Sequence, residues 1–193
     1  VTLAMMNIGR GFARIYTKAT TILVDDPLFT FIGSGKILGG VPIQFVYMLV
    51  VIVISGLILN RTKFGRNIYA VGDNKQAASY SGINSRRVTM TVFVIMGIFA
   101  SCAGILSSAR TFSAQFNVGE GSEMDAISAV VLGGTSMSGG VGRLSGTIIG
   151  CIVIGVLNNG MNILGIDSSW QYVVKGVVVL IAVFIDYIKK MKD

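Results

Sequence analysis

The sequence predicts an all-α integral membrane protein, a multi-span helical bundle with one broken or re-entrant segment. Three observations point to this class. Of the 193 residues, 52% are hydrophobic and only 13% are charged, whereas about a quarter of the residues of a soluble domain are charged. The uncharged residues gather in runs of roughly 20, the length that a membrane-spanning helix needs. One further uncharged run holds five glycines, which disfavour a regular helix facing lipid.

The first 40 residues predict a helix and then an ordered external loop. Residues 1–17 place apolar residues at helical spacing and are interrupted by basic residues, whereas residues 25–42 begin with two aspartates and a proline and contain several glycines. We expect the helix to end near the outer surface. The chain starts without the features of a secretory signal, and we expect that several N-terminal helices of a longer protein are missing from it.

Four uncharged or nearly uncharged runs predict membrane spans. Three of them carry no charge and are the clearest, namely residues 41–59, 88–109 and 144–166. The fourth, residues 170–188, has Lys175 and Asp186 towards its ends, where we expect both side chains to snorkel. Its aromatic residues suit the interfacial belts of a membrane; they are Trp170, Tyr172 and Tyr187.

Residues 126–142 contain the five glycines and predict a broken or re-entrant half-helix. Irregular backbone at membrane depth is tolerated only where protein or a water-filled cavity covers it. Glu123 and Asp125 precede this segment, and we assign their carboxylates to stabilising its N-terminus rather than to substrate contact. Gly146 and Gly150 form a small-xxx-small pair, which predicts close helix packing within the bundle, with a subunit interface as the alternative.

Loop charges predict the orientation, because short cytoplasmic loops are rich in Lys and Arg. Residues 61–87 contain six basic residues and one acid, whereas residues 110–125 contain one arginine and three acids. The first loop is therefore expected in the cytoplasm and the second outside. The basic tail "KKMKD" places the C-terminus inside, so residues 126–142 must count as a crossing.

The loop 61–87 contains a predicted short helix over residues 74–81, capped by Asp73 or Asn74 and ended by Gly82. A helix about 12 Å long is not stable alone, so we expect a partner surface to hold it. Its small residues, Ala77, Ala78, Ser81 and Gly82, favour docking into a groove of another protein. The alternative is that the basic residues of the loop only set topology and contact anionic lipid.

Other chemistry is not indicated. There is no histidine, and Cys102 and Cys151 lie in apolar runs without metal-ligand spacing, so we expect two buried small side chains, no metal site and no catalytic residue. The glycine-rich segments at 33–36 and 139–146 lack the residues or the βαβ context of a nucleotide site. Most of the basic residues lie in loops, which argues against nucleic acid as a partner.

Polar residues in apolar segments leave two interpretations open. They are Asn158, Asn159 and Asn162 in the third clear span, and Thr135 and Ser136 at the glycine break. Hydrogen bonds between helices would fix the bundle. Alternatively, these side chains line a pathway for a hydroxyl-rich solute.

Four segments resemble the permease subunits of bacterial ATP-binding-cassette (ABC) sugar importers, in the ribose-type branch of the monosaccharide permeases. They are "RTKFGRNIYAVGDNKQAASYSGIN", "DAISAVVLGGTSMSGGVGRLSGTIIG", "VLNNGMNILGIDSSWQYVVKG" and "LIAVFID". The resemblance extends from Val1 to about Lys190. It differs at Asp73 and at residues 122–125, the latter in the external loop.

The resemblance implies an ABC importer permease, with residues 1–193 as one transmembrane domain and residues 61–87 as its cytoplasmic coupling loop. It implies a multi-pass location in the bacterial cytoplasmic (inner) membrane and import of a monosaccharide such as ribose by alternating access. The implied partners are membrane lipid, a second permease chain as a homodimer, an extracytoplasmic sugar-binding protein, and ABC ATPase subunits that hold ATP and Mg. No cofactor is implied for this chain.

In such permeases a cytoplasmic loop helix docks in a cleft of the ATPase. The matching positions are Asn74, Ala77, Ala78, Ser81 and Gly82. The alternatives are a secondary transporter or channel for a small polar solute, or a scaffold. A secondary transporter usually has a membrane-embedded acid or histidine, which we do not expect in the centre of any span here.

Overall fold

The computed structural model of the chain describes residues 2–37 and 40–192, without the side chains of Ser168, Ala182 and residues 185–192. Within these ranges the chain forms nine helices and four strands of two residues each, which confirms the all-α class. Contacts group the residues into two compact units, residues 1–53 with 91–120, and residues 54–90 with 121–193.

The first unit contains α1 (Thr2–Tyr16), as predicted for residues 1–17. The segment predicted as an ordered loop contains a helix as well, α2 (Pro27–Ser34). Asp26 caps this helix, because its carboxylate accepts the Leu28 N–H at 2.8 Å, and Pro27 suits the first helical position. Two antiparallel strand pairs complete the unit: β1 (Ile22–Leu23) with β4 (Ser113–Ala114), and β2 (Lys36–Ile37) with β3 (Val41–Pro42).

Two long helices have residues in both units. They are α3 (Ile43–Arg61) and α6 (Ser85–Arg110). Together with α8 (Leu144–Ile163) they are long and apolar enough to cross a membrane, in agreement with the three clear spans. The fourth predicted span lies in α9 (Ser168–Lys192). The side chains of Asp186, Tyr187 and the basic tail lie outside the described residues.

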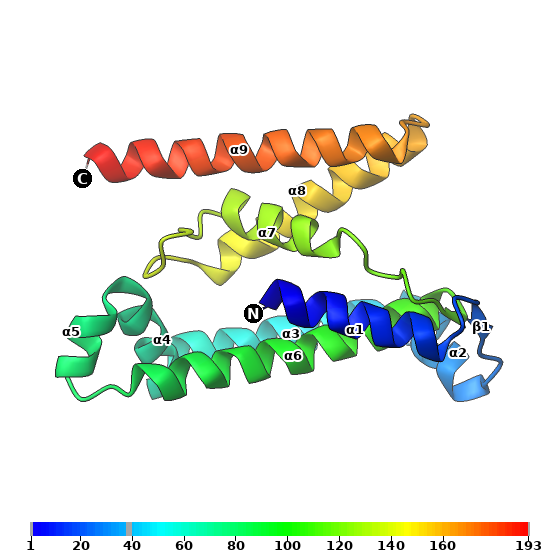
Figure 1. Cartoon of the computed structure of the whole chain (residues 1–193), viewed down its shortest axis with the longest axis horizontal. Helices are drawn as coiled ribbons and strands as arrows, with labels where there is room; N and C mark the ends of the chain where they lie inside the picture. The colour runs from blue at the N-terminus through cyan, green and yellow to red at the C-terminus, as the bar shows by residue number, and fades with distance from the viewer. Residues whose placement is uncertain (1, 38–39, 193) are drawn as a thin grey trace. The chain divides into compact units, whose positions relative to one another are not determined.

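In the second unit, α7 (Ser122–Leu132) packs against both α8 and α9 (Figure 1). Its 11 residues span about 16 Å, roughly half of the hydrocarbon core of a bilayer. The irregular residues 133–143 follow and lead into α8. This arrangement confirms the predicted half-helix with a glycine-rich break.

The small-xxx-small pair Gly146 and Gly150 lies in the contact between α7 and α8. A Cβ at Gly146 would collide with the backbone of Gly133, and one at Gly150 with the carbonyl of Ala129. The two helices can therefore approach closely only because these positions lack a side chain. Packing within the bundle, the first of the two interpretations above, accounts for this pair.

The exposure of both cysteines differs from what the sequence predicts. Cys102 and Cys151 are exposed on the surface of the chain, so the prediction that they are buried is wrong. The apolar runs around them face outward on α6 and α8, where lipid or another protein surface would cover them. An apolar sequence around a cysteine does not distinguish the core of a protein from a surface that faces lipid.

Candidate functional site

The predicted short helix of the loop is present as α5 (Lys75–Tyr80). Asn74 caps its start, because its Oδ1 accepts the N–H groups of Gln76 and Ala77, each at 3.0 Å. At its end Gly82 has a φ of +82°, a left-handed conformation that favours glycine. Of the two predicted caps the structure therefore selects Asn74.

A second helix of this loop, α4 (Lys63–Asp73), was not predicted. Thr62 caps it by accepting the Gly65 N–H at 3.0 Å. Its apolar residues recur at helical spacing, at Phe64, Ile68 and Val71. Basic residues lie among these apolar residues and obscure the pattern, but the spacing of the apolar residues matches the helical period of 3.6 and predicts this helix.

A small hydrophobic core joins the loop helices to α6. Its buried members are Val71 of α4, Ala78 of α5 and Val88 of α6, with exposed fractions of 7%, 4% and 8%. Partly buried apolar residues pack around them, namely Phe64, Ile68, Ala70 and Ile83. The surface that holds the short helix therefore belongs to this chain itself.

The five predicted docking residues have different surroundings in the structure. Ala77, Ser81 and Gly82 are exposed, whereas Ala78 points into the core and the Asn74 side chain serves as the cap. Ala78 and Asn74 thus shape α5, and contact of the five residues with an ATPase stays a prediction. Tyr80, which was not singled out from the sequence, is 91% exposed.

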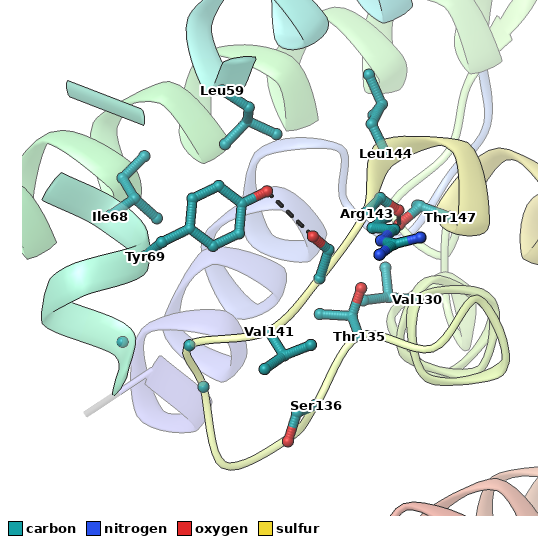
Figure 2. Close-up of a pocket in the computed structure, with 14 residues that line it drawn as sticks. Leu59, Ile68, Tyr69, Val130, Thr135, Ser136, Val141, Arg143, Leu144 and Thr147 are labelled. Atoms are coloured by element: carbon teal, nitrogen blue, oxygen red, sulfur yellow. Dashed lines mark hydrogen bonds between the residues drawn. The ribbon is translucent and has the colours of Figure 1, made fainter. Parts of the chain in front are cut away.

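The end of α4 lies against the glycine-rich break. The Tyr69 hydroxyl donates to the Gly142 carbonyl oxygen at 3.2 Å (Figure 2). A Cβ on Gly72 would lie 2.8 Å from the Gly140 nitrogen, and one on Gly139 would lie 2.5 Å from the Gly72 oxygen. We call this contact of Gly72 with Gly139 and Gly140, together with the Tyr69–Gly142 hydrogen bond, the glycine clasp.

A cavity of about 330 Å³ lies beside the glycine clasp. Figure 2 shows Thr135 and Ser136 on the irregular segment that borders it. Ser136 is buried, and its N–H donates to the Val141 carbonyl at 2.9 Å. These two predicted pathway residues thus lie next to the loop helix α4, and their role in a pathway stays a prediction.

A polar cluster joins α7, α8 and α9. Lys175 Nζ lies 2.7 Å from Asp125 Oδ1, and Asn158 Nδ2 donates to Asp125 Oδ2 at 3.1 Å. The Lys175 side chain is 13% exposed and that of Asp125 is 30% exposed. The ammonium group of Lys175 lies in an ion pair about two helical turns into α9, and its snorkelling to the membrane interface stays a prediction. Asp125 was predicted to stabilise the N-terminus of its own helix, and in the structure it also contacts side chains of α8 and α9.

The three asparagines of α8 differ in their hydrogen-bond partners and their exposure. Asn158 bonds to α7, and Asn162 Oδ1 accepts from Gln171 Nε2 of α9 at 2.9 Å. Asn159 is exposed. Contacts between helices thus engage Asn158 and Asn162, as the packing interpretation requires, while lining of a pathway stays a prediction for all three.

Three helices long and apolar enough to cross a membrane, together with the half-helix α7 and its glycine-rich break, define a helical membrane protein. Residues 1–183 match the protein family described as the permease component of the branched-chain amino acid transport system. The chain belongs to this family. No solved structure matches the chain.

The relatives include several sugar permeases. The chain is 46% identical over 187 residues to the ribose import permease protein RbsC of Bacillus subtilis (strain 168), covering 96% of this chain and 58% of that protein. It is 44% identical over 189 residues to RbsC of Escherichia coli (strain K12), covering 96% and 59%. The L-arabinose transport system permease protein AraH of Escherichia coli (strain K12) is 38% identical over 189 residues, covering 98% and 57%. The chain thus spans less than two thirds of the length of these relatives.

Proposed function

We propose that this chain is part of the permease subunit of an ABC importer that moves a monosaccharide, ribose or a related pentose, across the bacterial cytoplasmic membrane. The observation that supports this most is the 46% identity to a ribose import permease over 96% of the chain. Permeases named for xylose and L-arabinose are also among the relatives. Because these names include three pentoses, ribose is the first sugar to test and the other two follow.

The exposed side of α5 is the proposed contact with the ATPase subunit. Ala77, Ser81 and Gly82 present small groups there, which allow a partner surface to approach the helix closely, and Tyr80 adds a large exposed ring. Both ends of α5 are capped and Ala78 anchors it in the loop core. A firmly held helix can transmit a displacement, whereas a loosely tethered one would absorb it.

In this proposal ATP and Mg are bound by the partner ATPase subunits, and this chain contributes the pathway and the coupling surface. Closure of the ATPase subunits moves α5, and the bundle alternates between outward-open and inward-open states. A sugar-binding protein delivers the substrate from outside, and a second copy of the permease completes the pathway. The basic loop 61–87 contacts anionic lipid at the cytoplasmic side as well.

Uptake by the reconstituted complex tests the proposal. The full-length permease is assembled in vesicles with its ATPase and its sugar-binding protein, and the uptake of labelled ribose, xylose and L-arabinose is measured with and without ATP inside. We expect ATP-dependent uptake of at least one of these sugars. Uptake that needs no ATP and is abolished by a protonophore would instead support a secondary transporter.

A charged substitution on α5 tests the coupling surface. We expect Ala77→Glu to abolish the stimulation of ATP hydrolysis by the loaded binding protein, because a carboxylate then lies in the contact. Lys36→Glu, an exposed charge change in the other compact unit, is the control for charge alone. Normal stimulation in the Ala77→Glu complex, with normal membrane insertion, would contradict the assignment of α5.

A further inference from the structure

We propose that α4 and the glycine-rich break, residues 133–143, move as one rigid body through the glycine clasp. A displacement of α5 then reaches the end of α7 and the start of α8 without passing along α3 or α6. This inference rests on the proposed function in one respect, that α5 contacts the ATPase. It assigns a positioning role to Gly72, Gly139 and Gly140.

The first link runs from α5 to α4 and contains no flexible linker. Asn74 is both the residue that ends α4 and the residue that caps α5. Its N–H donates to the Ala70 carbonyl at 3.1 Å, while its side chain accepts from the first turn of α5. The loop core, Val71 with Ala78 and Val88, holds the two helices together on one side. These contacts make α4 and α5 one unit.

The second link runs from α4 to the break and consists of backbone contacts. A Cβ on Gly140 would lie 2.9 Å from the Asp73 Cα, closer than real Cβ atoms come to another atom. A Cβ on Gly72 would collide with the Gly140 backbone, and one on Gly139 with the Gly72 backbone. Backbone atoms in direct contact have no side-chain rotamers that could take up a displacement. The contact is therefore stiff compared with one between long side chains.

The conformation of the break supports this link. Gly139 and Gly140 have φ angles of +95° and +77°, which L side chains rarely adopt. The Ser136 N–H donates to the Val141 carbonyl at 2.9 Å, which closes a tight turn around them. The Tyr69–Gly142 hydrogen bond lies just beyond this turn, so the clasp has a second contact besides the close approach of the glycines.

The third link runs from the break into the bundle. Arg143 is the N-cap residue of α8, directly after the clasp residue Gly142. On the other side, the Thr135 N–H donates to the Val130 carbonyl of α7 at 3.1 Å. Gly133 lies against Gly146 of α8, with 2.5 Å between a Cβ built on Gly133 and the Gly146 oxygen. A movement of the break therefore reaches α7 and α8 together.

Alanine substitutions with matched controls test the clasp. We expect Gly72→Ala to reduce the ratio of stimulated to unstimulated ATP hydrolysis to near one, and to reduce sugar uptake in parallel, with unstimulated hydrolysis unchanged. Gly155→Ala is the control in a helix, since a Cβ there meets nothing within 4 Å. Wild-type stimulation and uptake in the assembled Gly72→Ala complex would overturn the inference.

A second pair separates backbone strain from collision. Gly139→Ala introduces strain at a positive φ and also a collision with Gly72, whereas Gly165→Ala introduces strain at a φ of +67° with nothing within 4 Å. We expect only the first to uncouple hydrolysis from sugar. Equal losses in the two variants would assign the effect to strain alone and overturn the inference.

A reversible cross-link tests the rigid body even if an alanine variant fails to assemble. Asp73→Cys with Val141→Cys places two exposed thiols beside the clasp and keeps its glycines, because Asp73 lies against Gly140 and Val141 is the next residue. Cys102→Ser and Cys151→Ser remove the two exposed native thiols. The readouts are loss of thiol labelling on oxidation and hydrolysis before and after reduction.

We expect the disulfide to form and the oxidised complex to keep its stimulation by the loaded binding protein. Failure to form the disulfide would contradict the contact, and stimulation that returns only on reduction would show that the clasp must open. Failure of the proposed function looks different. In that case the unmodified complex shows no stimulation by ribose, xylose or L-arabinose, whereas cross-linking still reports on the clasp.

Discussion

Lys175 of α9 and Asp125 of α7 form an ion pair, with 2.7 Å between Nζ and Oδ1. Asn158 of α8 donates to the other carboxylate oxygen, so one carboxylate joins three helices. Among the described residues Asn158 Oδ1 has no hydrogen-bond donor. The half-helix α7 is too short to span a bilayer alone, and this cluster fixes it to its two long neighbours.

Removal of one charge of this pair should destabilise the bundle more than removal of both. We expect Lys175→Met or Asp125→Asn alone to lower the free energy of unfolding by about 1–3 kcal/mol, below the value for fully buried pairs because Asp125 is partly exposed. The double variant should lose less than the sum of the two. Thermal unfolding in detergent checks this, and a strictly additive double variant would contradict the pairing.

The two interpretations of Asn158 differ in what its replacement changes. If the side chain holds α7, Asn158→Leu should lower the melting temperature and leave the sugar concentration for half-maximal uptake unchanged. Asn159→Leu serves as the control, because Asn159 is exposed on the same helix. A large change in that sugar concentration at a wild-type melting temperature would favour lining of the pathway.

The cap of α5 can be weakened without touching its exposed face. Asn74→Ala removes the acceptor for two N–H groups and should destabilise the start of α5 by about 1 kcal/mol, whereas Asn74→Ser should restore most of it. Hydrogen exchange of the amides of residues 75–80 measures this directly. Unchanged exchange in Asn74→Ala would mean that the loop core alone holds α5.

The hydroxyl of Tyr69 provides a graded test of the contact between α4 and the break. Tyr69→Phe removes one hydrogen bond to the Gly142 carbonyl, which contributes about 1 kcal/mol, and leaves the backbone contacts in place. We expect a partial loss of stimulated hydrolysis, smaller than the loss in Gly72→Ala. A larger loss in Tyr69→Phe would assign the coupling to the hydrogen bond instead of the glycines.

Asp167, between α8 and α9, gives a pH-dependent prediction. The Ser169 hydroxyl and N–H donate hydrogen bonds to this carboxylate and lower its pKa below 3.8. The stabilisation by the charged cap is therefore complete above the ordinary pKa and is lost as the pH falls through the lowered one. We expect Asp167→Ala to lower the melting temperature at neutral pH, and the difference from wild type to shrink at pH values below the lowered pKa.

The elements that the sequence predicted well depend on local signals. The length of the uncharged runs predicted α3, α6 and α8. A polar capping residue before the short helix and a glycine after it predicted α5. The helix α4 was not predicted, because its apolar residues Phe64, Ile68 and Val71 are interspersed with basic residues. The basic residues were interpreted only as a signal of membrane orientation. Its periodicity was in the sequence and could have been found.

The tertiary contacts could not be predicted in this way. Asp125 and Lys175 are 50 positions apart, and no spacing rule relates a half-helix to a residue two turns into a later helix. Likewise, the composition of α5 showed a set of small residues but not which of them point inward. Ala77 and Ala78 are neighbours with opposite surroundings, since only contact with Val71 and Val88 distinguishes them.

The loop from Thr62 to Val88 begins with its own cap, shares Asn74 between its two helices and closes on its own small core. Such a segment is modular, because most contacts that shape it lie within it. An exchange of this block between related permeases would have to preserve only its two ends and the residues of the glycine clasp. Under the proposed function, a permease of this kind could therefore pair with a different ATPase while the residues proposed to line its pathway stay unchanged.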